Sequence, residues 1–121
     1  MDVFCKIVNG DIPSKCLYED ELVMVIMDVN PMSPGHSLII PKKHYKDLFD
    51  IDVDVLNHIM EIAVMMSKKL EERLNCEGIT LIQNNGISQE VKHFHLHIVP
   101  KYNNIEKLDI EDVFNKLVDK Y

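Results

Sequence analysis

The sequence predicts one α+β domain, residues 1–121, with a mainly antiparallel five-stranded sheet, one long helix and a short C-terminal helix. Three observations predict this class. Five short apolar segments lie between turn residues, which is typical of strands. One long segment carries apolar residues at helical spacing, and a shorter segment of the same kind ends the chain. A chain of 121 residues fits a single domain of ordinary size.

The N-terminal part is predicted to form a short helix followed by a hairpin. Phe4–Val8 is amphipathic and ends at the turn pair Asn9-Gly10, so we expect one or two helical turns there. Lys15–Tyr18 and Leu22–Asp28 are apolar runs separated by acidic residues, which is the spacing of a hairpin with an acidic turn. The second run is apolar on both faces, which predicts an interior strand.

The middle of the chain is predicted to form a strand, His36–Pro41, and then the long helix. Two prolines and a glycine exclude regular structure just before this strand. Apolar residues recur at steps of three and four from Asp52 or Asp54 to Leu74, and either aspartate can cap the helix. Gly78 stands near its end. The apolar surface of this helix is wider than one sheet requires, which indicates a second subunit unless the helix lies deep in its own domain.

The last part of the chain is predicted to form two strands and the closing helix. The strands are Ile79–Gln83 and Val91–Val99, with a turn at Asn84–Gly86 between them, and Pro100 is expected to end the second. A polar loop over 102–108 follows. One face of the closing helix then collects Ile110, Val113, Phe114, Leu117, Val118 and Tyr121.

Composition excludes several classes of partner. Acidic residues number 20 against 13 basic ones, a net charge of −7, so we expect no nucleic-acid or anionic-membrane partner. A small phosphate ligand remains compatible, because it needs only a local group of donors. The longest apolar run, Leu22–Met27, is too short to cross a bilayer. The three cysteines lack metal-finger spacing and there is no signal-peptide pattern, so a reducing, cytoplasmic location is expected.

The segment His93-Phe94-His95-Leu96-His97-Ile98-Val99 alternates imidazole and apolar side chains. Side chains of a strand repeat with period two, so the imidazoles are expected to line a site on one face. Three imidazoles suit a catalytic zinc, and a neutral imidazole is also a competent nucleophile toward phosphorus. Three surface histidines on a solvated strand are the alternative without a function. Spacing alone leaves these interpretations open.

The same segment fits the pattern His-φ-His-φ-His-φ-φ, with φ apolar, without a mismatch. Through it the chain resembles the histidine triad (HIT) family of nucleotide hydrolases and transferases, in its Hint-like branch of nucleoside phosphoramidases. The resemblance implies the HIT fold, catalysis without a required cofactor, and a homodimer joined through the long helix and Ile79–Gln83. Further segments that resemble the family are Phe4–Ser14, Asp28–Pro31, Pro34–His44 and Ile82–Gly86.

The resemblance also implies an activity, the hydrolysis of purine nucleoside 5′-phosphoramidates through a covalent nucleotidyl-histidine intermediate. His95 would attack the α-phosphate, His97 would contact phosphate oxygens and His93 would orient His95. His36 would face the same site as a fourth catalytic histidine. The implied nucleotide-binding residues are Asp28 for the ribose, Asn84 for the phosphate, Gln89 for the leaving group, and a purine slot of Phe4, Ile7, Ile12, Ile26, Val29 and Leu38. Ordinary core is the alternative role for the slot residues.

The chain departs from the family pattern in the loop before the triad. Relatives usually carry a small residue and a glycine just before Gln89, whereas here Ile87-Ser88 runs directly into Gln89. Many relatives place a hydroxyl where Glu90 stands. A carboxylate beside a phosphate is repulsive, so we expect Glu90 to point to solvent or to disfavour acidic leaving groups.

A structural zinc site is a further expectation from the family. Some bacterial relatives bind zinc with two cysteines near the N-terminus, the histidine after Pro-Lys-Lys and the first triad histidine. Here the ligands would be Asp2, Cys5, His44 and His93, with a carboxylate in place of one thiolate. The alternative is that Cys5 is a buried free thiol and His44 an ordinary loop residue.

Other functions remain open for the same sequence. A dinucleoside polyphosphate hydrolase would use the same site. A non-catalytic purine-nucleotide-binding module would bind without turnover, and a three-histidine metalloenzyme would lose activity to a chelator.

Overall fold

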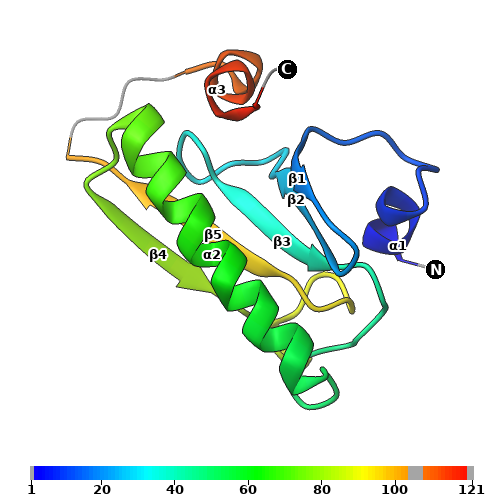
Figure 1. Cartoon of the computed structure of the whole chain (residues 1–121). Coiled ribbons are helices and arrows are strands. Elements are labelled where there is room, and N and C mark those ends of the chain that lie inside the picture. Colours follow the sequence, from blue (N-terminus) through cyan, green and yellow to red (C-terminus); the bar gives the residue numbers. More distant parts are fainter. Residues whose placement is uncertain (1, 104–107, 120–121) are drawn as a thin grey trace.

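The computed structural model describes residues 2–103 and 108–119 (Figure 1). Its five strands form one antiparallel sheet in the order β1-β2-β3-β5-β4, which confirms the predicted α+β class. The elements, in chain order, are α1 (Val3–Val8), β1 (Cys16–Glu19), β2 (Val23–Met27), β3 (Ser37–Pro41), α2 (Val53–Leu74), β4 (Gly78–Ile82), the 3-10 helix η1 (Gly86–Ser88), β5 (Leu96–Lys101) and α3 (Ile110–Leu117).

The β1–β2 hairpin and the interior position of β2 are as the sequence predicts. The Asp20 carboxylate accepts the backbone N–H groups of Leu22 and Val23 and so closes the acidic turn. All five residues of β2 are buried, because the strand lies between β1 and β3 and is covered on both faces. Val25 packs toward the main core, and Ile26 packs on the opposite face against Phe4.

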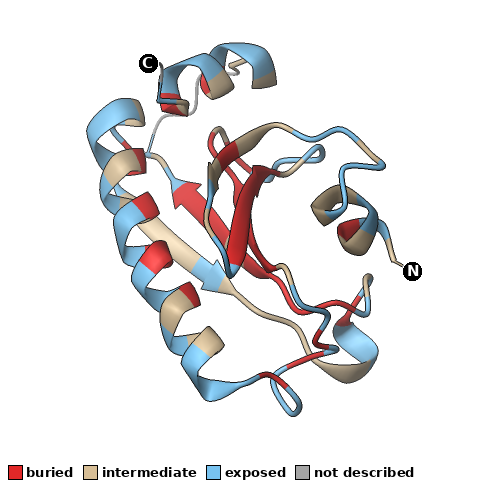
Figure 2. Cartoon of the chain, turned by 45° about the vertical axis from the view of Figure 1, so that its right-hand side comes forward, coloured by how far each residue is buried: buried red, intermediate tan, exposed pale blue. Residues whose placement is uncertain are grey.

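Helix α2 lies across the sheet and buries one side against it (Figures 1 and 2). Asp52 caps its N-terminus by accepting the Asp54 N–H, as predicted. At the other end Asn75, rather than Gly78, takes the left-handed conformation, with φ of 56°, and Gly78 begins β4. The buried side carries Ile59, Ala63, Met66 and Leu70, whereas Met60, Val64 and Met65 are exposed.

The opposite face of the sheet carries a second, smaller apolar layer. Phe4 of α1 packs there with Met24, Ile26, Leu38 and Ile40. The layers are therefore α2 with α3, the sheet, and α1. Within the described residues, no helix is long and apolar enough to span a bilayer.

The predicted strand Val91–Val99 is wrong at both ends. Strand β5 begins at Leu96, because Ile39 of β3 is the first residue that pairs with it, and the chain before Leu96 lies outside the ladder. Pro100 does not end the strand, because it pairs with Ile79 and the strand continues to Lys101. Of the predicted polar loop 102–108, residues 104–107 lie outside the described part, as does Tyr121 of the closing segment.

The segment that leads into β3 depends on one glycine. Gly35 has φ of 92°, and a Cβ there would lie 2.7 Å from Leu74 Cδ1 and 2.9 Å from Leu70 Cδ2. Only glycine combines this conformation with so close an approach to α2. The result is that His36, the next residue, is held at the start of β3.

Candidate active site

A cleft of about 1110 Å³ opens on the face of the sheet that α1 partly covers. It receives side chains from α1, β2, β3, β5 and the loop after β4, so residues far apart in the sequence meet there. Most of the predicted site lines it, namely Phe4, Ile7, Ile12, Ile26, Asp28, Val29, Leu38, Asn84, His95 and His97. His36, His93 and Gln89 lie outside this lining. Ile26 and Leu38 are both buried core residues and cleft residues.

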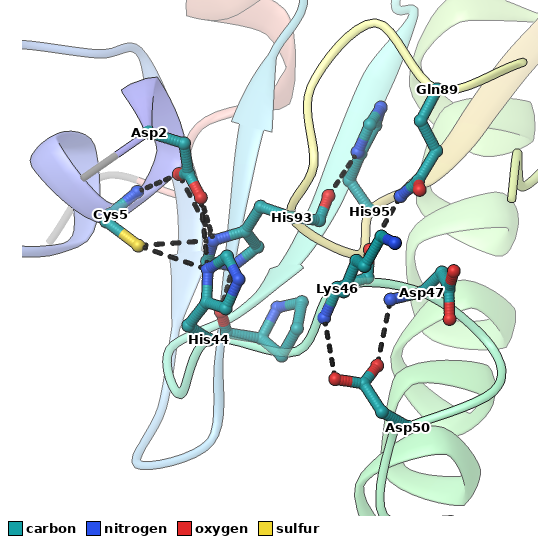
Figure 3. A network of polar contacts seen from close by, with 10 residues as sticks. Asp2, Cys5, His44, Lys46, Asp47, Asp50, Gln89, His93 and His95 are labelled. Carbon is teal, nitrogen blue, oxygen red and sulfur yellow. Dashed lines mark hydrogen bonds and ion pairs between the residues drawn. The ribbon is translucent and has the colours of Figure 1, made fainter. Parts of the chain in front are cut away.

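His95 has one ring nitrogen committed to the backbone (Figure 3). Its Nδ1 lies 2.8 Å from the carbonyl oxygen of His93, and because a carbonyl only accepts, Nδ1 carries the proton. Nε2 is therefore the unprotonated nitrogen of the neutral ring. Burial lowers the pKa of His95, which keeps this lone pair available at neutral pH.

His36 and His97 form a pair whose proton positions follow from one backbone contact. The Met32 N–H donates to His36 Nδ1 at 3.0 Å, so His36 carries its proton on Nε2. That Nε2–H donates to His97 Nδ1 at 2.9 Å, which leaves the His97 proton on Nε2. Burial, together with the neighbouring His95 and His36, lowers the pKa of His97 to about 4. The cleft therefore contains a neutral imidazole that can donate one hydrogen bond.

Asp28 completes this group. Its Oδ1 accepts the Asn30 N–H at 2.8 Å, and its Oδ2 lies 3.4 Å from His36 Nε2. The ligand atoms of Asp28, His36 and His97 are close enough together to hold a metal ion. The Met32 contact argues against that, since it fixes a proton on the His36 nitrogen that a metal would need. We interpret the three side chains as a hydrogen-bonded group.

His93 is fully buried and acts on the cleft only through its backbone. Its Nε2 donates to the carbonyl of Pro41 at 2.9 Å, so its Nδ1 lone pair points toward Asp2 and Cys5. The His95 ring lies 4.8 Å from Phe4 and 4.9 Å from His97, centroid to centroid. Phe94, Leu96 and Ile98 pack in the main core, on the side opposite the histidines, as the alternating pattern predicts. His93 and His95 precede strand β5 and are not part of its ladder.

The four predicted zinc ligands come together beside α1 (Figure 3). The ligand atoms of Asp2, Cys5, His44 and His93 all lie within 4.8 Å of one another. Cys5 Sγ is 3.5 Å from His44 Nδ1 and 3.4 Å from His93 Nδ1, and His44 Nδ1 is 3.0 Å from Asp2 Oδ2. Donors at zinc distances in a tetrahedron are separated by roughly 3.3–3.8 Å. Both distances from Cys5 Sγ lie in this range and the His44–Asp2 distance is shorter, so small side-chain shifts would let this group hold a zinc ion. Burial and the Asp2 carboxylate raise the pKa of the Cys5 thiol.

The loop after β4 differs from the expectation for Gln89. The Gln89 amide donates to the carbonyl of Lys46 at 2.6 Å, its side chain is buried, and it does not line the cleft (Figure 3). Ser88 and Glu90 line the cleft in its place. Glu90 is exposed, as expected, yet it lines the cleft and acts electrostatically on His95.

The sequence did not predict several further residues of the cleft. Lys15, Met32, Asp109, Ile110 and Glu111 also line it. The start of α3 reaches this position because Val113 and Leu117 are buried in the main core and Lys15 pairs with Glu111. No local sequence pattern predicts that docking.

Comparison with known proteins identifies the family. The family model described as the HIT domain matches residues 9–104. This chain belongs to the HIT domain family. An HIT-like protein of Methanocaldococcus jannaschii is 35% identical over 97% of this chain and 98% of its own length. An adenosine 5′-monophosphoramidase of Saccharomyces cerevisiae is 40% identical over 82% of this chain and 61% of its own length. An adenylylsulfatase of Arabidopsis thaliana is 39% identical over 82% of this chain and 51% of its own length.

The HIT fold is also shown by solved structures. A zinc-bound histidine triad family protein from Mycobacterium smegmatis superposes with a TM-score of 0.88 at 34% identity, and the match covers 95% of this chain and 88% of the other. Relatives of this chain thus include two proteins named as enzymes, an adenosine 5′-monophosphoramidase and an adenylylsulfatase.

Proposed function

We propose that the chain hydrolyses purine nucleoside 5′-phosphoramidates through a covalent nucleotidyl intermediate on His95. The observation that carries the proposal is the Nδ1–H bond of His95 to the His93 carbonyl, which leaves Nε2 unprotonated in a residue that lines the cleft. The related adenosine 5′-monophosphoramidase supports the choice of substrate class.

The proposed reaction takes two steps. In the first, the His95 Nε2 lone pair bonds to the α-phosphorus, the P–N bond of the substrate breaks, and the departing amine takes up one proton from solvent. In the second, water attacks the phosphorus, the bond to His95 breaks, and its electron pair returns to Nε2 while one proton is released. The Nε2–H of His97 donates to a phosphate oxygen in both steps, which stabilises charge that develops there.

The rest of the cleft suits a purine nucleotide. Phe4, Ile7 and Ile12 with the β2 and β3 side chains offer an apolar slot for the base. Asp28 would accept hydrogen bonds from ribose hydroxyls, since it lines the cleft next to His36. Asn84 would donate to the phosphate.

We also propose a structural zinc site formed by Asp2, Cys5, His44 and His93. When bound, zinc would supply a cross-link between α1 and the segment before β5. Asp2 also caps α1 by accepting the Cys5 N–H at 2.7 Å, and His93 holds His95 through its carbonyl. The zinc ligands would therefore connect Asp2, at the start of the helix that carries Phe4, with His93, whose carbonyl orients the ring of His95. No step of the reaction needs this site.

A homodimer through α2 and β4 is proposed as the assembly. Strand β4 is an edge strand, because its ladder within the described residues is with β5 alone, and Leu81 on it is exposed. Met60, Val64 and Met65 of α2 are exposed as well.

All three cysteines are free, which is consistent with the proposed cytoplasmic location.

The test is release of AMP from adenosine 5′-phosphoramidate by the purified protein and by two variants. We expect His95→Ala to lose essentially all turnover while it still binds AMP. The control is His58→Ala, which removes a histidine bonded to Asp20 outside the cleft and should keep turnover. Turnover by His95→Ala would contradict the proposal. Preference for diadenosine polyphosphates would favour the dinucleoside hydrolase, and AMP binding without turnover would favour a binding module.

A further inference from the structure

The charge around the cleft is strongly acidic for a site that is to bind a phosphate ester. Four carboxylates line it, those of Asp28, Glu90, Asp109 and Glu111. Lys15 is the one lysine or arginine among its lining residues within the described part of the chain, and it is paired with Glu111. The histidines supply hydrogen bonds but little positive charge, because burial keeps the pKa of His97 at about 4. The charge of the cleft therefore favours ligands in which the groups other than the phosphate are neutral or positively charged.

Glu90 and Asp109 are the two members of this set whose carboxylates have no hydrogen-bond or ion-pair partner among the described residues. Asp28 accepts the Asn30 N–H and lies by His36, and Glu111 is held by Lys15. Glu90 makes no hydrogen bond or ion pair with any residue that the structure describes, and Lys92, two positions on, donates instead to the Gly86 carbonyl. Its carboxylate is free to pair with a bound ligand.

The loop that carries Glu90 lies where a leaving group would be. The proposed base slot is formed by α1 with β2 and β3, and Asp28 marks the ribose. His95 marks the phosphorus, and the chain between β4 and β5 contributes Asn84, Ser88, Glu90 and Val91 to the lining. The Glu90 carboxylate is close enough to His95 to oppose the lowering of its pKa by burial. Gln89 is turned away to Lys46, and the Ser88 hydroxyl donates to the Asn85 carbonyl. Glu90 is then the charged residue that this loop contributes to the cleft, whereas Asp109 stands at the start of α3.

Given the proposed function, we propose that Glu90 selects substrates by the charge of the leaving group. It favours phosphoramidates of amines that carry a second, positively charged group, and it disfavours leaving groups that carry a carboxylate or sulfate. A partly exposed ion pair changes a binding equilibrium by up to about fivefold, and repulsion of an anion acts in the opposite direction. With about threefold in each direction, the ratio of kcat/KM between a cationic and an anionic leaving group should be about tenfold.

The experiment compares adenosine 5′-phosphoramidates of three amines of matched length. One ends in an ammonium group, one in a methyl group and one in a carboxylate. For each protein, kcat/KM is divided by its own value for the unsubstituted phosphoramidate, at low and at high salt. The variants are Glu90→Gln and, as a matched control, Glu72→Gln, which removes an exposed carboxylate of α2 outside the cleft.

We expect the wild type and Glu72→Gln to prefer the ammonium over the carboxylate substrate by about tenfold at low salt and less at high salt. Glu90→Gln should reduce that ratio to near one. Equal ratios in the wild type and Glu90→Gln, with normal turnover of the unsubstituted substrate, would overturn the role of Glu90 and leave the proposed function intact. Absence of turnover of every phosphoramidate by the wild type would overturn both.

Discussion

The hydrogen-bonded pair of His36 and His97 makes a measurable prediction about stability. His97 has its pKa lowered to about 4 because burial and two neighbouring imidazoles disfavour its charged form. An unfolded chain binds a proton at this residue near pH 6.5. Between pH 6.5 and about 4 the unfolded state therefore carries a proton that the folded state lacks, so acidification in this window favours unfolding.

The magnitude follows from the shift. At about 1.36 kcal/mol for each pH unit, a lowering from 6.5 to about 4 corresponds to about 3 kcal/mol of stability, present above pH 6.5 and lost by pH 4. The perturbation is His97→Asn, which removes the titrating ring and offers an amide oxygen to the His36 Nε2–H. Groups distant from His97 contribute equally to both proteins, so the comparison reports His97 together with its effect on the adjacent His36 and His95.

The assay is urea unfolding of both proteins at half-unit steps from pH 7.5 to 4, with chelator present throughout. The free energy of unfolding of the wild type should fall more steeply with acid than that of His97→Asn, and the difference should change by about 2–3 kcal/mol across the window. A difference that stays constant over this range would refute the reasoning, because His97 would then titrate alike in the folded and unfolded states. Equal urea dependence at each pH confirms that the same transition is compared.

Three further predictions concern other parts of the molecule. Gly35→Ala should lower the free energy of unfolding by about 1–3 kcal/mol, since alanine is strained at φ of 92° and its Cβ would meet Leu74 and Leu70; an unchanged urea midpoint would contradict this. Wild-type protein purified without chelator should contain about one zinc per chain by elemental analysis. Cys5→Ala should contain far less, whereas Cys76→Ala should retain it, and equal metal content in the two variants would count against the site. Leu81→Lys should shift a dimer toward monomer in sedimentation analysis, and a wild type that is already monomeric would exclude the proposed assembly.

The elements of the fold were predictable because each is specified locally. The helix cap at Asp52, the acidic turn between β1 and β2 and the apolar faces of β2 depend on residues close in sequence. The end of α2 at Leu74 was predicted, but the left-handed residue after it is Asn75 and not a glycine, because asparagine also tolerates that conformation. The start of β5 was misplaced because alternation predicts faces but does not reveal where partner strands begin.

In the candidate site, too, features specified by nearby residues were predictable and features that depend on distant contacts were not. The residues of the histidine segment and of the base slot were found from their pattern and from the family resemblance, and the structure brings most of them to one cleft. The position of Gln89 depends on a contact with the backbone of Lys46, which is distant in sequence. The approach of Asp109 and Glu111 depends on how α3 docks. Neither contact leaves a local signal, so the charge of the cleft became evident only in three dimensions.

The central claim is that phosphorus bonds transiently to Nε2 of His95. The direct measurement is mass spectrometry of the intact protein, quenched without acid soon after mixing with adenosine 5′-phosphoramidate, followed by peptide mapping. The account predicts one added nucleotidyl group on the peptide that contains His95, and its absence in His95→Ala. Rapid release of AMP with no adduct at any time point, or an adduct on another residue, would contradict it.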